Sequence, residues 1–418
     1  SVESGGNNDA IGVRIGGVAG RANLTNLYNV RVTGTIAASL CEKNEAFIGG
    51  LVGEYSVSSA EQAYIAYVEG CSAAIEIKNR NFDDGEKSVM ETVAAGGIFG
   101  SLSSYNCATA IVDCAVTGKV TGGSYAGGII GYVSGSYTTL VNCANYATVR
   151  ATSKDVTYAG GIVGFSGANN IIMDSVSMGD VRGVAATSGT YKSYAGGIVG
   201  FSAADDYDVY YSAGTAVINC YYKGKVQGYD LRNAWGTEKT GDFALDADFA
   251  EKTLGWEYMV IGTDGIALPV KRDNADTVYH LTLRNGDSRN DLEKPYKNGV
   301  FSLIGEPGAL PNAGTDLFFD WEHESGVRYR FFIPVVKDMT LTAKFHSSEG
   351  IEGIYAGTAT LYETKDAGAL KFNADGTLQW INSTVTAGKY TWDGYHILFT
   401  FYDNTGEASG TFSDGKVY

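Results

Sequence analysis

The first half of the chain lacks proline, histidine and tryptophan. All 5 prolines, all 4 histidines and all 5 tryptophans of the 418 residues lie at or beyond Trp235. The first 226 residues instead hold 34 of the 56 glycines. Without histidine, this region excludes Ser-His and Cys-His nucleophilic catalysis. The split predicts a Gly-rich array followed by ordinary small domains.

Basic residues and long apolar runs are also scarce. Lys and Arg number 31 against 47 Asp and Glu, which makes the formal net charge −16. That balance argues against nucleic acid and anionic lipid as partners, because both are bound by clustered basic side chains. No stretch approaches the about 18 apolar residues that span a bilayer. The first residues show no secretory signal pattern, so we expect signal and anchor segments to lie outside this sequence.

A pentapeptide of the form Gly-Gly-apolar-apolar-Gly occurs six times. Its copies begin at Gly16, Gly49, Gly96, Gly127, Gly160 and Gly196. A second landmark follows each copy and aligns the turn residues Asn29, Gly70, Asp113, Asn142, Asp174 and Asn219. The next column holds Val30, Cys71, Cys114, Cys143, Ser175 and Cys220. Asn, Asp and Gly tolerate left-handed backbone conformations, so the first column predicts one turn per repeat, where stacked amides can hydrogen-bond.

These repeats predict an all-β fold. Each one holds two or three short strands of β-branched residues between glycine turns, with no helical period. One repeat cannot bury its own apolar face, whereas a stack of six can. We therefore predict a parallel β-solenoid (β-helix) over residues 1–226, with the paired glycines at tight corners. Four of the 6 cysteines fall in one inward column and are predicted to be free core thiols; Cys41 and Cys107 have no assigned place.

The repeated text YAGGIVGF, with its Asn-Cys strand segment, resembles the GLUG repeat over roughly residues 12–226. Ala19 departs from that pattern, since a larger apolar residue is usual there. The resemblance implies a bacterial surface or secreted protein, a group that includes adhesins and some immunoglobulin A1 metalloproteases. HExxH is missing, and Glu322, His323 and Glu324 lack the spacing for two zinc ligands on one helical face. Metalloprotease chemistry is therefore not expected in this chain.

Three further segments follow the array. Residues 227–275 are predicted to cap the open end of the solenoid, with Trp256 as an anchor and a short helix over 243–252. Residues 276–346 resemble the Listeria–Bacteroides repeat, a small ubiquitin-like β module of cell-surface proteins, with Asp320 and Phe345 as departures. Residues 350–418 contain hairpin turn signals and predict an antiparallel β meander or sandwich. The last residues look like a strand, so we expect that module to be incomplete.

The candidate binding residues lie in an acidic, tyrosine-rich loop that could hold calcium or stack on a sugar. They are Asp205, Asp206, Tyr207, Asp208, Tyr210 and Tyr211. A second acidic loop carries Asp83, Asp84 and Glu86. Both loops also fit solvated turns, where Asp is common. Trp380 and Trp392 are either a site or core aromatics of the last module. CxxC and phosphate-loop motifs are absent, so we predict no catalytic residue, no metal ligand and no cofactor.

These features together favour a non-enzymatic, adhesin-like protein of the bacterial cell surface. We expect its extracellular solenoid to bind a host or microbial surface protein or glycan, without nucleic acid and without membrane insertion. The alternative is a carbohydrate-active β-helix, a polysaccharide lyase or glycosidase, that uses loop carboxylates. Glycosidic cleavage requires two carboxylates about 5–9.5 Å apart, so the placement of the acidic side chains distinguishes the two.

Overall fold

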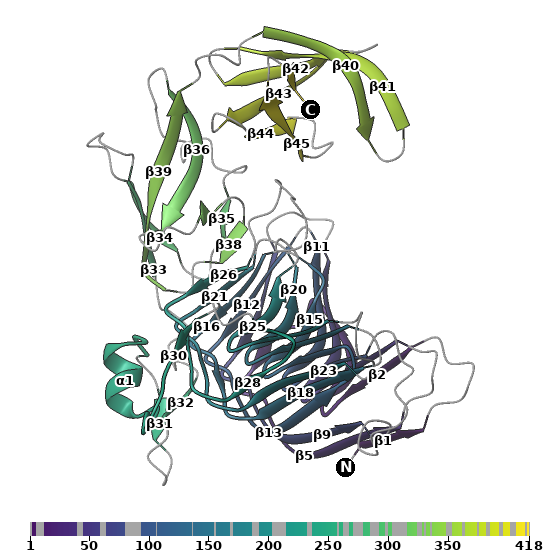
Figure 1. Cartoon of the computed structure of the whole chain (residues 1–418). Coiled ribbons are helices and arrows are strands. Elements are labelled where there is room, and N and C mark those ends of the chain that lie inside the picture. Colours follow the sequence, from purple (N-terminus) through teal and green to yellow (C-terminus); the bar gives the residue numbers. More distant parts are fainter. Residues whose placement is uncertain are drawn as a thin grey trace.

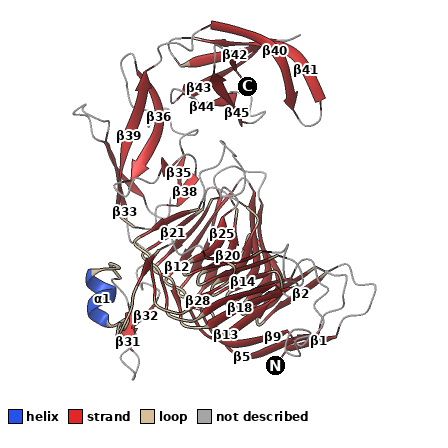
Figure 2. Cartoon of the chain, viewed as in Figure 1, coloured by secondary structure: helices blue, strands red, loops and turns tan. Residues whose placement is uncertain are grey.

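The computed structural model describes most of residues 2–417 (Figure 1). The ranges left out are 6–11, 40–44, 59–63, 80–92, 106, 136, 154–155, 168–169, 186–191, 203–214, 232–235, 257–258, 262–266, 271–278, 285–291, 297–299, 303–315, 324–327, 330–331, 335–336, 348–352, 362–363, 374–375, 382–384, 393–395, 402–406 and 414–415. Strands dominate the described part, and its one helix has six residues (Figure 2).

Four parallel sheets wind around a common core in the first half of the chain (Figures 1 and 2). The chain passes through sheets B, C, D and A in that order, and one such circuit is called a level here. Strands of successive levels pair in parallel and in register, as when Tyr158 pairs with Tyr125 on one side and Tyr194 on the other. The described residues form six complete levels. The predicted parallel β-solenoid is therefore confirmed.

Sheet A contains β1 Val2–Gly5, β5 Arg31–Ser39, β9 Ser72–Asn79, β13 Ala115–Gly122, β17 Ala144–Asn145, β18 Thr148–Ser153, β22 Val176–Ser177, β23 Val181–Ala185, β27 Tyr221–Tyr222, β28 Val226–Gln227 and β30 Thr237–Glu238. Sheet B contains β2 Val13–Gly16, β6 Ala46–Gly49, β10 Val93–Gly96, β14 Tyr125–Gly127, β19 Thr157–Gly160, β24 Ser193–Gly196 and β29 Asp230–Leu231. Sheet C contains β3 Ala19–Asn23, β7 Val52–Ser58, β11 Phe99–Tyr105, β15 Ile130–Val133, β20 Val163–Ser166 and β25 Val199–Ser202. Sheet D contains β4 Leu27–Tyr28, β8 Tyr64–Glu69, β12 Cys107–Val112, β16 Thr138–Val141, β21 Ile171–Met173 and β26 Ala216–Ile218.

Each level has at least four strands, so the expectation of two or three was wrong. The chain turns from sheet D to sheet A at the repeated turn column. All six residues of the column have a positive φ: Asn29 54°, Gly70 63°, Asp113 54°, Asn142 53°, Asp174 49° and Asn219 48°. Amides also link neighbouring levels here, because Asn142 Nδ2 donates to Asp113 Oδ1 at 3.0 Å. The predicted turn is confirmed.

The paired glycines lie where sheet B turns into sheet C. A Cβ on Gly160 would stand 1.8 Å from the carbonyl oxygen of Val163, and one on Gly161 would stand 2.0 Å from that of Gly197 in the next level. Neither glycine has a left-handed φ. Close approach of backbone to backbone, rather than an unusual conformation, therefore requires glycine at this corner.

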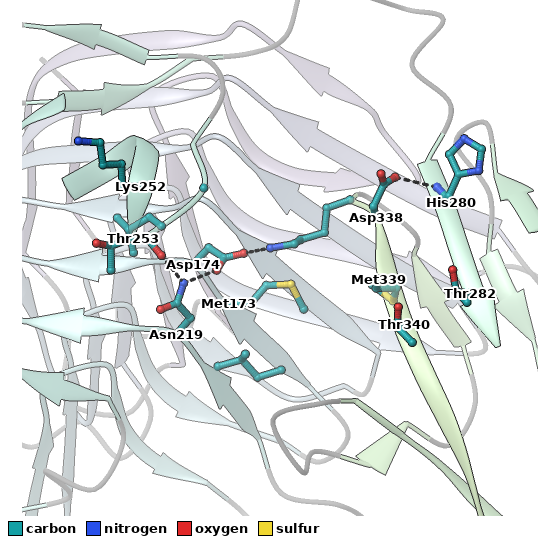
Figure 3. Close-up of a pocket in the computed structure, with 14 residues that line it drawn as sticks. Met173, Asp174, Asn219, Lys252, Thr253, His280, Thr282, Asp338, Met339 and Thr340 are labelled. Carbon is teal, nitrogen blue, oxygen red and sulfur yellow. Dashed lines mark hydrogen bonds and ion pairs between the residues drawn. The ribbon is translucent and has the colours of Figure 1, made fainter. Parts of the chain in front are cut away.

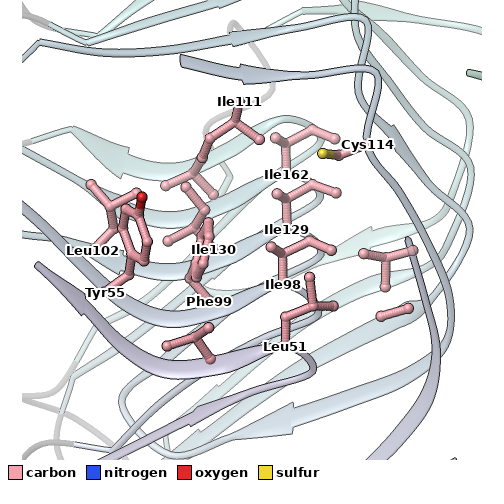
Figure 4. Packing of buried hydrophobic residues seen from close by; sticks show 14 of the residues in the cluster. Leu51, Tyr55, Ile98, Phe99, Leu102, Ile111, Cys114, Ile129, Ile130 and Ile162 are labelled. Carbon is pink, nitrogen blue, oxygen red and sulfur yellow. The ribbon is translucent and has the colours of Figure 1, made fainter. Parts of the chain in front are cut away.

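Stacked aliphatic side chains fill the interior (Figure 4). One column from successive levels has no solvent exposure: Leu51, Ile98, Ile129, Ile162 and Ile198. Cys71, Cys114, Cys143 and Cys220 form another buried column, and all four are free thiols, as predicted. The Cys114 thiol donates to the carbonyl oxygen of Val112 at 3.3 Å. Cys107 begins β12 and is also buried, whereas Cys41 lies outside the described residues.

The buried thiols make the fold sensitive to alkaline pH. Burial raises the pKa of the Cys114 thiol, and the neighbouring thiols of Cys143 and Cys71 raise it further. Burial likewise raises the pKa of Cys220. A thiol whose pKa is raised by folding stabilises the fold below its unfolded pKa, and this contribution is lost as pH rises toward the folded pKa. We expect about 1–2 kcal/mol of unfolding free energy to be lost per protected thiol at pH 10.

Urea titrations at a series of pH values between 7 and about 10 measure this loss. The double variant Cys114→Ala, Cys220→Ala should be less stable at neutral pH, with a shallower dependence on pH above about 8.5. Parallel pH profiles for the variant and the wild type would show that these two thiols are not the groups involved.

The segment after the solenoid covers its flank. Helix α1, Ala247–Lys252, lies within the predicted 243–252 and is capped by Asp246, which accepts from the Phe249 N–H at 2.9 Å. Trp256 packs with this helix against outward-facing Ala144 and Val176 of sheet A. The hairpin of β31 Met259–Ile261 and β32 Ala267–Pro269 adjoins it. At the end of the solenoid, β29 and β30 extend sheets B and A by one strand each.

Two β modules complete the chain. The first is a mixed sheet in the order β34-β33-β39-β36-β37, in which β33 and β39 are parallel, with a small β35–β38 pair. Its strands are β33 Tyr279–Arg284, β34 Leu292–Tyr296, β35 Val300–Ser302, β36 Asp316–His323, β37 Arg328–Tyr329, β38 Phe332–Pro334 and β39 Met339–Ser347. The second is an antiparallel meander of β40 Gly353–Leu361, β41 Thr364–Phe372, β42 Thr377–Ile381, β43 Val385–Trp392, β44 His396–Phe401, β45 Glu407–Ser413 and β46 Lys416–Val417.

Candidate functional site

The first β module packs against the outer face of sheet D. That face is apolar and buried, and it consists of Ile65, Tyr67, Ala108, Ala110, Val112, Val141, Met173 and Ile218. Strand β38 contacts β12, and Figure 1 shows β35 and β38 beside the strands of sheet D. All six residues of β12 are buried, so this strand is covered on both faces. The module and the solenoid therefore share an interface.

A cavity of about 730 Å³ opens beside this interface (Figure 3). Three parts of the chain line it. The solenoid contributes Met173, Asp174, Ile218 and Asn219; the segment after α1 contributes Lys252, Thr253, Leu254 and Gly255; the module contributes His280, Thr282, Lys337, Asp338, Met339 and Thr340. Ligand sites occur preferentially between domains and have volumes of about 300–1,000 Å³, so this cavity is the candidate site.

Asp174 connects all three parts. Its side chain is only 6% exposed, and its Oδ1 accepts from Asn219 Nδ2 of the next level at 2.7 Å. Its second carboxylate oxygen forms an ion pair with the ammonium of Lys337, from the module. Its backbone oxygen accepts from the indole N–H of Trp256 at 2.8 Å. The left-handed turn that places Asp174 at the corner thus also fixes the position of the cavity walls.

The second carboxylate in the cavity, that of Asp338, also links two parts of the chain. Asp338 Oδ1 accepts from the backbone N–H of His280 at 2.8 Å, which joins the start of β39 to the start of β33. Asn219 Nδ2 also donates to the carbonyl oxygen of Thr253 at 2.8 Å. Both carboxylates that line the cavity therefore hold neighbouring parts of the chain together.

The ion pair between Lys337 and Asp174 is expected to hold the module on the solenoid. Replacement of Lys337 by Met leaves the Asp174 carboxylate buried without its cation, which costs more than the loss of an exposed pair. We expect the free energy of unfolding to fall by about 1–3 kcal/mol. Small-angle scattering should show a larger radius of gyration. Lys337→Arg serves as the control that keeps the charge, and equal radii for all three proteins would contradict the expectation.

Aromatic rings form a ladder on the outer corner between sheets B and C. The rings of Tyr125, Tyr158 and Tyr194 are stacked at 5.3 Å between centroids, with interplanar angles of 10° and 6°. Phe165 and Phe201 stack beside them at 5.6 Å. Their faces are directed at one another, so the ladder presents edges rather than the ring faces on which a sugar would stack. It therefore acts chiefly as packing between levels.

The loop candidates from the sequence lie elsewhere. Asp205, Asp206, Tyr207, Asp208, Tyr210 and Tyr211 all fall outside the described residues, as do Asp83, Asp84 and Glu86. Trp380 lies in β42 and Trp392 in β43. Within the described ranges, no group of three or more His, Cys, Asp or Glu side chains could hold a metal ion. In the same ranges, no helix has the length and apolarity needed to cross a membrane.

Sequence reasoning missed the cavity. Its residues are separated by up to 167 positions, from Met173 to Thr340, and they meet only because the module packs on sheet D. One signal was present. In β12 the sequence CATAIV has small or apolar residues at almost every position, which is typical of a strand buried on both faces. That pattern indicates a covered outer face but not which segment covers it.

Comparisons with known proteins give partial matches. No protein-family model matches the chain, so the likeness to the GLUG repeat stays a prediction. Over 161 residues, 37% of this chain, it is 32% identical to Halomucin of Haloquadratum walsbyi. The match spans 2% of the length of that relative. A solved structure assigned as an immunoglobulin A1 protease from Bacteroides ovatus aligns with 58% of this chain and 86% of its own, at 15% identity and a TM-score of 0.29. No functional conclusion follows from a likeness at that TM-score.

Proposed function

We propose that the chain is a non-enzymatic, adhesin-like protein of the bacterial cell surface, related to GLUG-repeat proteins, which binds a protein or glycan ligand outside the cell. The observation that carries this proposal is the six-level solenoid with a second module packed on its flank. Such stacks present long, rigid surfaces to partners. The partial match to a relative that is named as a mucin agrees with a surface location.

The alternative of a carbohydrate-active enzyme requires two free carboxylates facing one another across a cleft. In the cavity, Asp174 is engaged by Lys337 and Asn219, and Asp338 by the backbone of His280. These partners favour a binding role over a hydrolytic one at this place.

Binding assays with the intact chain test the proposal. Labelled protein is applied to a glycan array and to a panel of immobilised extracellular-matrix proteins and mucins, with heat-unfolded chain as the control. We expect saturable binding by the folded protein alone. Release of reducing sugar from a polysaccharide panel, or failure to bind any array or panel member, would contradict the proposed function.

A further inference from the structure

We propose that the cavity between sheet D and the first β module is a binding site for a short, neutral oligosaccharide. This inference rests on the proposed binding function and assigns it a site and a ligand class. Its basis is an amphipathic pair of walls, one polar and one apolar, joined by the Lys337–Asp174 ion pair (Figure 3).

The polar wall is one face of the module's sheet. Thr282 on β33 lies directly opposite Thr340 on the parallel strand β39. His280 precedes Thr282 by two residues on β33 and so lies on the same face. Asp338 comes just before β39 and accepts from the backbone N–H of His280. The two threonines lie about 5 Å apart across the strands, and His280 lies about 7 Å from Thr282 along β33. Of the alternate residues, Leu281 and Leu341 are buried, and Met339 also lines the cavity.

The apolar wall comes from the solenoid. Met173 and Ile218 occupy paired positions in neighbouring levels and belong to the apolar outer face of sheet D. Asn219 follows Ile218 and places an amide at the edge of this wall. Figure 3 shows Met173 on one side of the cavity, with Thr282 and Thr340 on the other.

A sugar ring matches these two walls. Its hydroxyl groups both donate and accept hydrogen bonds, as threonine hydroxyls do, while its C–H face is apolar. A neutral sugar fits best because the lysines of the cavity already have partners: Lys337 is paired with Asp174 and Lys252 with Asp248. An anionic ligand would have to compete with these carboxylates.

A peptide strand fits this cavity less well. Peptides that add to a sheet use the free edge of an outer strand. Here β33 is paired with β34 and β39, and β39 with β33 and β36. The backbone groups of the polar wall are therefore already used within the module, which leaves side chains alone to recognise the ligand.

The test removes the two hydroxyl groups and keeps the shape. Valine is isosteric with threonine and suits a strand, so the variant Thr282→Val, Thr340→Val should fold. Its control is Thr342→Val, which changes the next residue on the same face of β39, opposite Arg284 and outside the cavity lining. Each protein is applied to an array of short neutral oligosaccharides, and the strongest binder is then titrated by calorimetry. We expect the double variant to bind about ten-fold more weakly and the control to stay within about two-fold of wild type.

The outcomes separate this inference from the proposed function. If wild type binds an oligosaccharide and the double variant binds equally well, the cavity is not the site, although glycan binding stands. If the neutral array is blank while the matrix-protein panel is positive, the inference fails and the proposed function survives. If both panels are blank, both fail. An equal loss in Thr342→Val would also overturn the assignment, because it would reflect a general effect on the module.

Discussion

Replacement of Gly160 by Ala is expected to prevent the solenoid from folding normally. The new Cβ would stand 1.8 Å from the Val163 carbonyl oxygen and 2.6 Å from the Gly200 amide nitrogen of the next level. Both atoms belong to backbone that is hydrogen-bonded between levels, so neither can move without breaking the register of sheets B and C. We expect the free energy of unfolding to fall by about 3–5 kcal/mol or more. Urea denaturation followed by far-UV circular dichroism measures this.

Gly34→Ala provides the matched comparison. Gly34 has φ of 137°, but a Cβ there would meet no atom within 4 Å. This variant therefore carries backbone strain without a steric clash, and we expect a loss of about 1–3 kcal/mol. If Gly160→Ala proves no more harmful than Gly34→Ala, close approach at the corner is not the reason for the repeated glycines.

The second large effect is expected for Trp256→Ala. Trp256 is 1% exposed, and its ring joins helix α1 to the outward side chains of sheet A. Truncation leaves a large cavity and removes the donor to the Asp174 backbone oxygen. A loss of about 3–5 kcal/mol is expected from similar truncations of buried aromatic residues. Thermal unfolding monitored by calorimetry reports it.

Trp256→Phe separates packing from the hydrogen bond. Phenylalanine retains most of the apolar contact but leaves the Asp174 oxygen without the indole N–H. We expect about 1–3 kcal/mol for this change. An unchanged melting temperature for Trp256→Ala would show that the segment after the solenoid is not anchored through this ring.

Local repetition explains why so much of the solenoid could be predicted. The pentapeptide indicated the corner, Asn29 and its equivalents indicated the left-handed turn, and the column containing Cys114 indicated the interior. These features depend on the residue itself and on its copy one level away. The number of strands per level was underestimated because the two repeated columns mark only the turns from sheet B to sheet C and from sheet D to sheet A, whereas the chain also turns between sheets C and D and between sheets A and B.

The candidate site could not be predicted in the same way. Asp174 has a distinct role because Lys337 lies against it, and 163 positions separate the two in sequence. Nothing in the spacing of either residue indicates the other. The pairing arises from burial of the apolar face of sheet D, where one module among several segments supplies the cover. The acidic, tyrosine-rich loop from Asp205 to Tyr211 lies outside the described residues, so its role stays a prediction.

Within the solenoid, each level packs only against its neighbouring levels, and this has a consequence for how the length of the solenoid can evolve. An added or deleted level changes the rod by about 4.8 Å and leaves the contacts between the other levels intact. The cavity draws its solenoid residues from the last two complete levels, through Asp174 and Asn219. The module covers the outer face of sheet D from β8 onward, so copies gained or lost before that level would alter the reach of the cavity without altering its walls. The length of the solenoid and the residues that line the cavity can therefore be selected independently in one polypeptide.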